Sequence, residues 1–216
     1  MHDLEETIQQ RRSTRMFLPR PVPRHLVEES LALAMRAPSN SNVQPWQIVF
    51  TSGAARDRLV AALLKQARAE PPRVPQLPPG FAHLRRDLGA QVYGAMGIAR
   101  DDADGRRTAV LRNWEFFRAP LGAVVFMHQD LDHVDSMGVG MFVQTLLLAL
   151  TARGLSTCVQ VSIAGYPDIV RRQLGIASYM RILCGLAVGY PDPAFPGNSI
   201  RIGRDPVDAH AVFLDE

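Results

Sequence analysis

The feature that most restricts the fold of this chain is a long apolar segment in its second half. Residues 132–153 have the composition of one helix, and Gly138 and Gly140 permit close approach of a neighbouring helix. A helix that is apolar on all sides has to be buried on all sides. Its most apolar part, residues 139–152, is interrupted by Gln144 and is shorter than the roughly 20 residues of a bilayer span. A chain of 216 residues can hardly enclose such a helix, so we predict a dimer interface and no membrane span.

The remaining apolar residues fall into short runs of two kinds. Helical spacing predicts a short opening helix around Leu4 and Ile8 and further helices over residues 24–37, 54–68 and 168–174. Apolar runs of strand length predict strands over residues 46–50, 123–127, 155–161 and 181–188. The length and the pattern fit one globular domain over residues 1–216.

Two segments look less like core. Residues 70–107 begin with five prolines between Pro71 and Pro79 and end in a charged patch. We predict a mobile excursion there, which either covers a site as a lid or is a plain insertion. Residues 191–216 contain four prolines and several charges, and we predict an extended C-terminal tail.

Charge and cysteine content exclude several classes of protein. The chain has 24 basic and 21 acidic residues, an excess too small for a nucleic-acid-binding face. Cys158 and Cys184 lie far apart in apolar stretches, which fits neither a disulfide framework nor a CxxC pair. The first 15 residues include acids and lack the apolar region of a secretory signal. We therefore expect a cytoplasmic protein that binds no nucleic acid.

Common catalytic signatures are missing from the sequence. It contains no GxSxG, HExxH, Walker A or GxGxxG motif. Its six histidines show no paired metal-ligand spacing, so we predict no metal site. Because no catalytic acid, base or nucleophile can be nominated, a bound cofactor is expected to carry the chemistry.

Two polar segments indicate what kind of cofactor. Residues 11–15, Arg-Arg-Ser-Thr-Arg, place three guanidiniums and a hydroxyl after a short helix, and arginine matches phosphate oxygens in a bidentate way. Residues 37–46, APSNSNVQPW, form a proline-bounded turn whose amides and hydroxyls suit a sugar alcohol and a heterocycle edge. The alternatives are a solvated basic turn and an ordinary structural turn.

The sequence RRSTRMF followed by APSNSNVQPW resembles the nitroreductase family in both order and spacing. Residues 154–158 and 162–166 resemble the strand and loop that follow one face of the isoalloxazine in that family. Residues 196–201 resemble its C-terminal phosphate-binding stretch, and residues 112–120 resemble a segment of the nitrobenzene and nitrobenzoate reductase branch. The resemblance extends over nearly the whole chain and is weakest over residues 70–107.

The resemblance implies a fold, a cofactor and a reaction. The fold is α+β, with a central, mostly antiparallel sheet flanked by helices, in an intertwined homodimer with two FMN sites at its interface. NADPH or NADH reduces FMN and leaves, and a nitroaromatic or quinone-like acceptor then takes the electrons in a ping-pong scheme. The same scaffold also carries flavin fragmentation, reductive dehalogenation and enone reduction, and a flavin-binding protein without turnover is a further alternative.

The resemblance further implies three groups of FMN-binding residues. The phosphate and the pyrimidine edge are bound by Arg11, Arg12, Ser13, Arg15 and Arg201. The other subunit contributes Pro38, Ser39, Asn40 and Asn42. A backbone N–H is directed at flavin N5 from the group Ile163, Ala164 and Gly165. Arg15 is expected near flavin N1 and O2, where a fixed cation raises the reduction potential.

The sequence departs from the family pattern at two points. Many members carry an acidic residue where this chain has Ala164. Because the N5 contact is made by backbone, this change affects the expected substrate preference more than flavin binding. A second basic residue, which some relatives place near the pyrimidine edge, cannot be located because its expected region is the divergent one.

Overall fold

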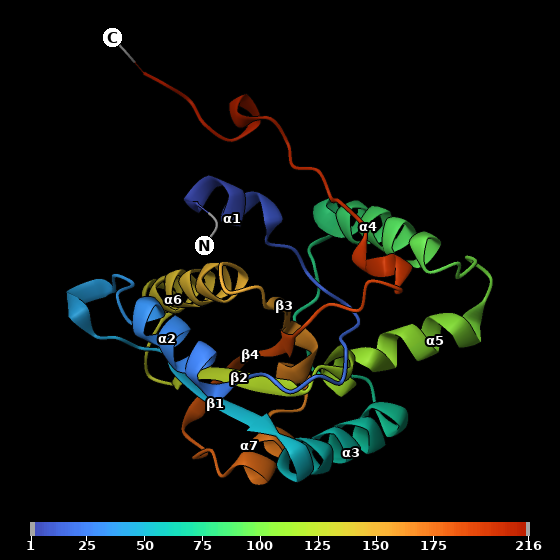
Figure 1. The fold of residues 1–216 in the computed structure, drawn as a ribbon, viewed down its shortest axis with the longest axis horizontal. Helices are drawn as coiled ribbons and strands as arrows, with labels where there is room; N and C mark the ends of the chain where they lie inside the picture. Colours follow the sequence, from blue (N-terminus) through green and yellow to red (C-terminus); the bar gives the residue numbers. More distant parts are fainter. Residues whose placement is uncertain (1–2, 215–216) are drawn as a thin grey trace.

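The computed structural model of the chain describes residues 3–214. Its centre is one four-stranded sheet with the strand order β1-β2-β4-β3, in which every neighbouring pair is antiparallel (Figure 1). The strands are β1 (Gln47–Ser52), β2 (Leu121–His128), β3 (Ser156–Gln160) and β4 (Met180–Gly189). The predicted α+β fold with an antiparallel sheet is confirmed, and each strand lies within two residues of its predicted bounds.

Helices cover both faces of this sheet. The helices of the described chain are α1 (Leu4–Gln10), α2 (Arg24–Ala34), α3 (Gly53–Ala69), α4 (Ala82–Ala95), α5 (Ala103–Leu111), α6 (His133–Thr151) and α7 (Pro167–Leu174). Helix α2 ends three residues before its predicted end, because the residue before a proline disfavours helical backbone and Pro38 follows Ala37. The short 3-10 segments that matter below are η1 (Asn40–Asn42), η3 (Arg112–Arg118), η4 (Val161–Gly165) and η5 (Pro196–Asn198).

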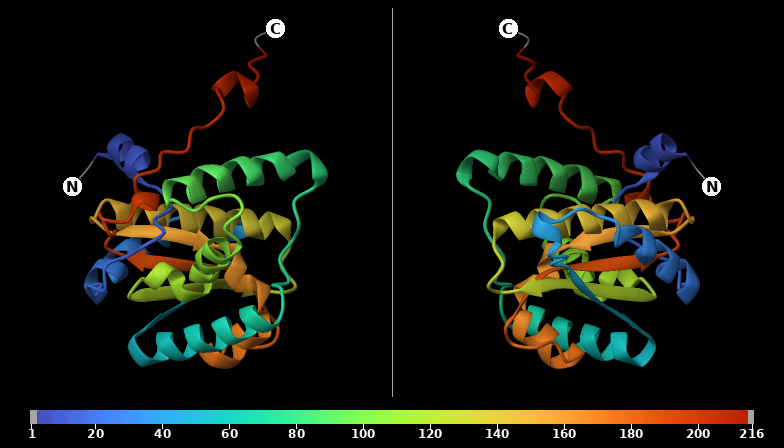
Figure 2. Two further views of the ribbon diagram at one scale, coloured as in Figure 1. Left: turned by 90° about the vertical axis from the view of Figure 1, so that its right-hand side faces the viewer. Right: turned by 90° about the vertical axis from the view of Figure 1, so that its left-hand side faces the viewer.

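The two faces of the sheet bury two separate cores. Successive side chains of a strand point to opposite faces, so Val124 packs with α3, α7 and η3, whereas Val125 packs with α2 and α6. Both valines are fully buried. Figure 2 shows the resulting layers, with α6 on one side of the sheet and α3 with α7 on the other.

Helix α6 is the predicted long apolar helix. A capping box between Asp132 and Asp135 begins it. By length and composition it could cross a membrane, but core helices pass the same test, and α6 packs against α2 and the sheet. One chain covers only one side of it: Phe142 is fully buried, whereas Met137 and Met141 are 66% and 40% exposed.

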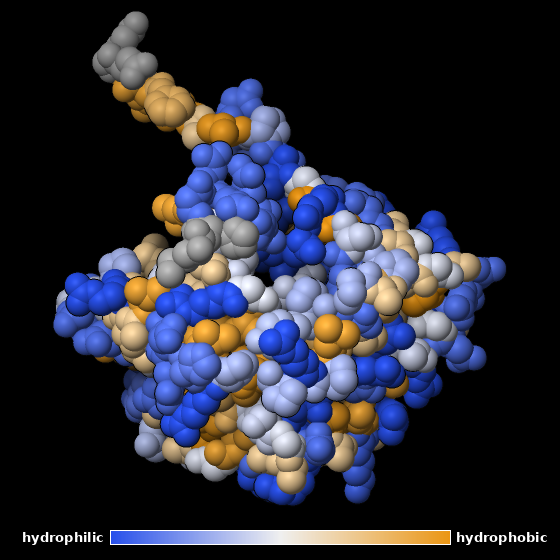
Figure 3. All heavy atoms as spheres, in the orientation of Figure 1, coloured by the Kyte–Doolittle hydropathy of each residue, from blue (hydrophilic) through white to orange (hydrophobic). Residues whose placement is uncertain are grey.

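The excursion and the tail lie at the margin of this body. Residues 70–107 include α4 and the first part of α5, for which the sequence pattern predicted no bounds. Helix α4 lies alongside the body and buries only Val92 (Figure 2). After η5 the chain runs away from the body, and the apolar side chains near its end stand clear of it (Figure 3).

Candidate active site

A cleft of about 370 Å³ lies between the segment that follows α1 and the first residues of the tail. It is lined by Gln9, Arg11, Arg12, Ser13, Arg15, Leu88, Ile200, Arg201, Ile202 and Arg204. Thus the cleft brings together all five residues expected at the phosphate and the pyrimidine edge. Among the described residues that line it there are five arginines and no acid. This excess of guanidinium charge suits a dianionic ligand such as a phosphate monoester.

The charges of the cleft lie close enough to affect one another. Partial burial lowers the pKa of the Arg12 guanidinium, and the nearby charge of Arg201 lowers it further. Two guanidiniums that repel each other in this way are stabilised by an anion placed between them. The residues present therefore fit the phosphate end of FMN.

Asn198 joins the two walls of the cleft, and sequence reading gave it no such role. Its side-chain amide donates to the carbonyls of Met16 and Asp192, at 2.8 and 3.0 Å, and its side-chain oxygen accepts the Arg15 backbone N–H at 2.8 Å. Its own carbonyl accepts from Nε of Arg12 at 3.1 Å. The residue is only 6% exposed, so it joins segments that lie 182 to 186 residues apart in the sequence. Its place inside the motif over residues 196–201 was the only sequence signal.

The N-terminal wall is also attached to the sheet. Ser13 forms a parallel bridge with Thr157, and the Thr14 N–H donates to the Thr157 carbonyl at 2.9 Å. This contact partly covers β3, which is an edge strand. Cys158 follows Thr157 in β3. Burial raises the pKa of its thiol to about 11, although the positive charge of Arg15 acts to lower this pKa. The thiol therefore stays neutral near pH 7 and is not a nucleophile.

The predicted N5 loop follows directly at the other end of β3. Ile163 is fully buried and packs on β4, where a Cβ at Gly185 would lie only 2.4 Å from it. Ala164 is partly exposed and Gly165 is buried. Val159 and Val161 are 39% and 55% exposed, which leaves an apolar surface from the end of β3 into the start of η4. Such a surface suits a flat aromatic ring system.

The third group of predicted residues lies elsewhere in the chain. Pro38, Ser39, Asn40 and Asn42 form an exposed turn at the start of α6, where a Cβ at Gly138 would lie 3.2 Å from Cβ of Ser39. Asn42 has a φ of 55°, and the Gln44 N–H donates to Oγ of Ser39 at 3.0 Å. In Figure 1 this turn lies at the far end of α6 from the arginine cleft. One chain therefore does not bring it to the other two groups.

The fold and the cleft together define an α+β domain with an arginine-lined cleft, suited to a phosphorylated ligand, beside the edge strand of its sheet. The model of the nitroreductase family matches residues 8–190, and this chain belongs to that family. It is 35% identical to a 4-nitrobenzoate reductase of Pseudomonas putida, over 98% of this chain and 96% of that protein. It is 39% identical to the nitroreductase NfnB of Mycolicibacterium smegmatis, over 93% of this chain and 88% of that protein.

The solved structures agree with the sequence relatives. The crystal structure of the FMN-dependent nitroreductase NfnB from Mycobacterium smegmatis, in complex with NADPH, superposes with a TM-score of 0.91. The match covers 97% of each chain at 35% sequence identity. The nitroreductase fold that the sequence predicts is thereby confirmed.

Proposed function

We propose that this chain is an FMN-dependent oxidoreductase that transfers electrons from NAD(P)H to nitroaromatic acceptors. The observation that carries the proposal is the cleft with five arginines at one end of β3, with an apolar surface and η4 at the other end. FMN, when bound, supplies hydride and electron transfer in a ping-pong reaction. NADPH is the preferred donor to test, because the neighbour solved with its nucleotide holds NADPH. Nitrobenzoates are the acceptors to test first, because a relative is named for 4-nitrobenzoate.

The protein contributes binding, orientation and electrostatics. Arg11, Arg12, Ser13 and Arg201 bind the phosphate in this proposal, and Arg15 stabilises negative charge at the pyrimidine edge. The backbone of Ile163, Ala164 and Gly165 faces the reactive edge of the ring. The first five residues line one cleft, and Ile163, Ala164 and Gly165 belong to η4, which directly follows β3.

A homodimer is part of the proposal. Helix α6 presents an exposed stripe that includes Met137 and Met141, and the end of the tail exposes Phe213 and Leu214 by more than 80%. A groove of about 630 Å³, lined in part by Leu31 and Phe50, runs beside β1, the other edge strand. A second copy would cover these surfaces and bring its Pro38, Ser39, Asn40 and Asn42 turn to the first copy's flavin. We further propose that the dimer is cytoplasmic.

The first experiment measures cofactor identity and turnover together. Apoprotein is titrated with FMN and with FAD, and the loaded protein is assayed for NADPH oxidation with 4-nitrobenzoate, a quinone and an enone. We expect selective FMN binding and turnover that is fastest with the nitroarene. Fastest turnover with the enone would favour the alternative reactions, and FMN binding without turnover would favour a flavin-binding protein.

The Arg201→Ala variant tests the cleft itself. Loss of one charge-assisted contact to phosphate, worth about 1.5 to 3 kcal/mol, should weaken FMN binding roughly ten- to hundredfold. Arg172→Ala removes an exposed arginine on α7, at the other face of the sheet, and serves as the control. If the two variants bind FMN with equal affinity, then the phosphate of FMN does not contact Arg201.

A further inference from the structure

Two side-chain hydrogen bonds tie η4, and the last residue of β3 before it, to η3. The indole N–H of Trp114 donates to the carbonyl of Ser162 at 3.2 Å. The side-chain amide of Gln160, at the end of β3, donates to the carbonyl of Asn113 at 2.6 Å. The bond from Trp114 enters η4 in its middle, so it restrains the segment that the proposed function places at the reactive edge of the flavin.

A second set of contacts ties the other end of η4 to the start of the excursion. The Arg73 N–H donates to the Gly165 carbonyl at 3.0 Å, and the Tyr166 hydroxyl donates to the Glu70 carbonyl at 2.5 Å. A Cβ at Gly165 would lie 2.5 Å from Cβ of Pro72, so only glycine permits this close approach. Burial, and then Glu70, raise the pKa of Tyr166, which keeps its hydroxyl protonated as a donor.

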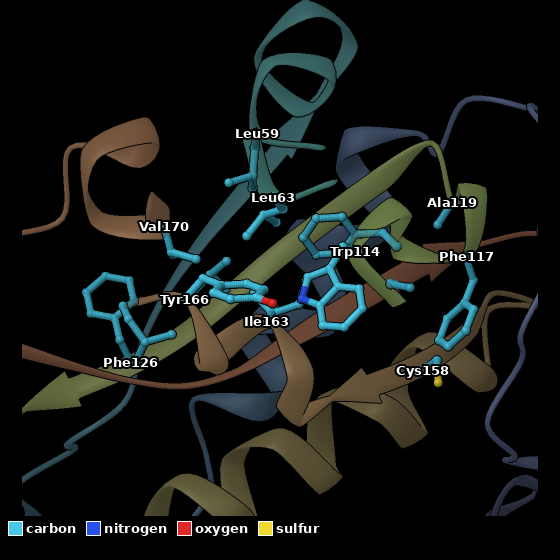
Figure 4. Packing of buried hydrophobic residues seen from close by; sticks show 14 of the residues in the cluster. Leu59, Leu63, Trp114, Phe117, Ala119, Phe126, Cys158, Ile163, Tyr166 and Val170 are labelled. Atoms are coloured by element: carbon cyan, nitrogen blue, oxygen red, sulfur yellow. The ribbon is translucent and has the colours of Figure 1, made fainter. Parts of the chain in front are cut away.

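The two donors, Trp114 and Tyr166, also support each other. Their ring centroids lie 5.7 Å apart in a tilted arrangement, and the residues are only 4% and 6% exposed. Figure 4 shows the two rings side by side above Ile163, with Leu63 of α3 next to them. Rings packed in this way have little freedom, so the hydrogen bonds they make are held in place.

The backbone of η3, the element that contains Trp114, is strained. Phe116, Phe117 and Arg118 follow one another with φ values of 52°, 51° and 63°. Left-handed backbone is unfavourable for each of these non-glycine residues, and it persists only where the surroundings enforce it. Phe116 is fully buried against Gly122, where a Cβ would lie 3.1 Å from its ring. Strain of this kind gathers at functional sites, and here it lies two residues from Trp114.

From these contacts we propose that Trp114 and Tyr166 are positioning residues for the flavin reaction. They hold η4 in the backbone conformation that presents its N–H groups to the flavin, whereas the arginine cleft binds the phosphate. The inference rests on the proposed function. It assigns phosphate binding and the positioning of η4 to different residues. Loss of either donor should slow hydride transfer far more than it weakens FMN binding, because misplacement of a reacting edge costs rate.

The test compares two tryptophans in the FMN-loaded protein. Trp114→Phe removes the indole N–H and keeps an aromatic ring. Trp46→Phe is the matched control for the exchange measurement, since Trp46 is 6% exposed, donates to Sδ of Met35 at 3.2 Å and packs in the core on the opposite face of the sheet. Because Trp46 ends the turn over residues 37–46, Tyr179→Phe is the control for FMN affinity and flavin reduction. The measurements are amide hydrogen exchange over residues 161–166, the FMN dissociation constant, and the rate at which NADPH reduces the flavin.

For Trp114→Phe we expect faster exchange in η4 and flavin reduction slowed about ten- to hundredfold, with FMN affinity within about twofold of wild type. Trp46→Phe should leave exchange in η4 unchanged. Tyr166→Phe, with Tyr179→Phe as its control on an exposed ring, tests the second donor and serves as the main variant if Trp114→Phe does not fold.

Two outcomes would overturn the inference. One is exchange and reduction rates in Trp114→Phe and Tyr166→Phe that match those of their controls. The other is a loss of FMN affinity as large as the loss of rate, which would mean that Trp114 and Tyr166 contribute to FMN binding itself. Failure of the proposed function has a different signature, because the wild-type protein itself would then bind no FMN or oxidise no NADPH.

Discussion

At the scale of the residue, Asn198 is the side chain on which the arginine cleft depends most. Replacement by alanine would remove the donors to Met16 and Asp192 and the acceptor for Arg15 in a buried setting. Leaving such groups unsatisfied should lower the free energy of unfolding by on the order of 1 to 3 kcal/mol. We also expect weaker FMN binding, because the backbone of Arg15 loses its partner and the Asn198 side chain no longer joins the two walls of the cleft. Denaturant unfolding and FMN titration of Asn198→Ala measure the two effects.

The matched control is Asn113→Ala, whose side-chain amide donates only to the nearby Val110 carbonyl at an exposed site. This variant should keep wild-type FMN affinity and lose little stability. An Asn198→Ala protein as stable and as tightly loaded as the control would show that the walls of the cleft are held by other contacts.

At the scale of the element, α6 carries the prediction about assembly. Met141 is 40% exposed in the single chain, and the proposed dimer would bury it. An aspartate there would place an unpaired charge in an apolar interface, at a cost of several kcal/mol. Met141→Asp should therefore be monomeric and lose FMN, because the turn that includes Asn40 would no longer reach the partner's site. Light scattering and flavin absorbance on one sample measure both properties.

The control for this element is Val110→Asp on α5, because Val110 has the same exposure of 40% as Met141. It introduces the same charge into a different helix and should stay dimeric with bound FMN. A Met141→Asp monomer that retains one FMN per chain would contradict the shared site.

At the scale of the whole molecule, the two cysteines report on both cores. Cys158 lies in the core beside η3 and Cys184 in the core beside α6. Burial raises the pKa of each thiol from 9.0 to about 11. Because the pKa of each thiol is higher in the folded than in the unfolded protein, the unfolded protein loses its thiol protons first as pH rises. The free energy of unfolding is therefore unaffected below pH 9 and falls as pH rises from 9 to 11. Each thiol accounts for about 2 to 3 kcal/mol over that window.

Two measurements check this prediction. Denaturant unfolding as a function of pH should show stability falling above pH 9, and the Cys158→Ala, Cys184→Ala double variant should show a shallower fall. Alkylation near neutral pH should modify both thiols only as fast as the protein unfolds. Rapid labelling of either cysteine in the native protein would mean that its core opens locally.

Local pattern determined the elements of this protein well. The strands, the long helix α6 and the basic segment at residues 11–15 follow from apolar spacing, turn residues and charge, which act over a few residues. The segment at residues 196–201 was found only through its resemblance to the nitroreductase family. The bounds of α4 were not predicted, because this helix buries only Val92 and so leaves little apolar periodicity in the sequence.

Only the tertiary structure decided which segments meet. The sequence supplied the arginines and the loop with Ile163, Ala164 and Gly165, but their convergence depends on Asn198, whose partners lie up to 186 residues away. The contacts of Trp114 and Tyr166 with η4 are likewise long-range, and a sequence pattern carries no signal for a hydrogen bond between a side chain and a distant carbonyl. Periodicity reports which side of an element is apolar, whereas the identity of the group it faces is set by packing of the whole chain.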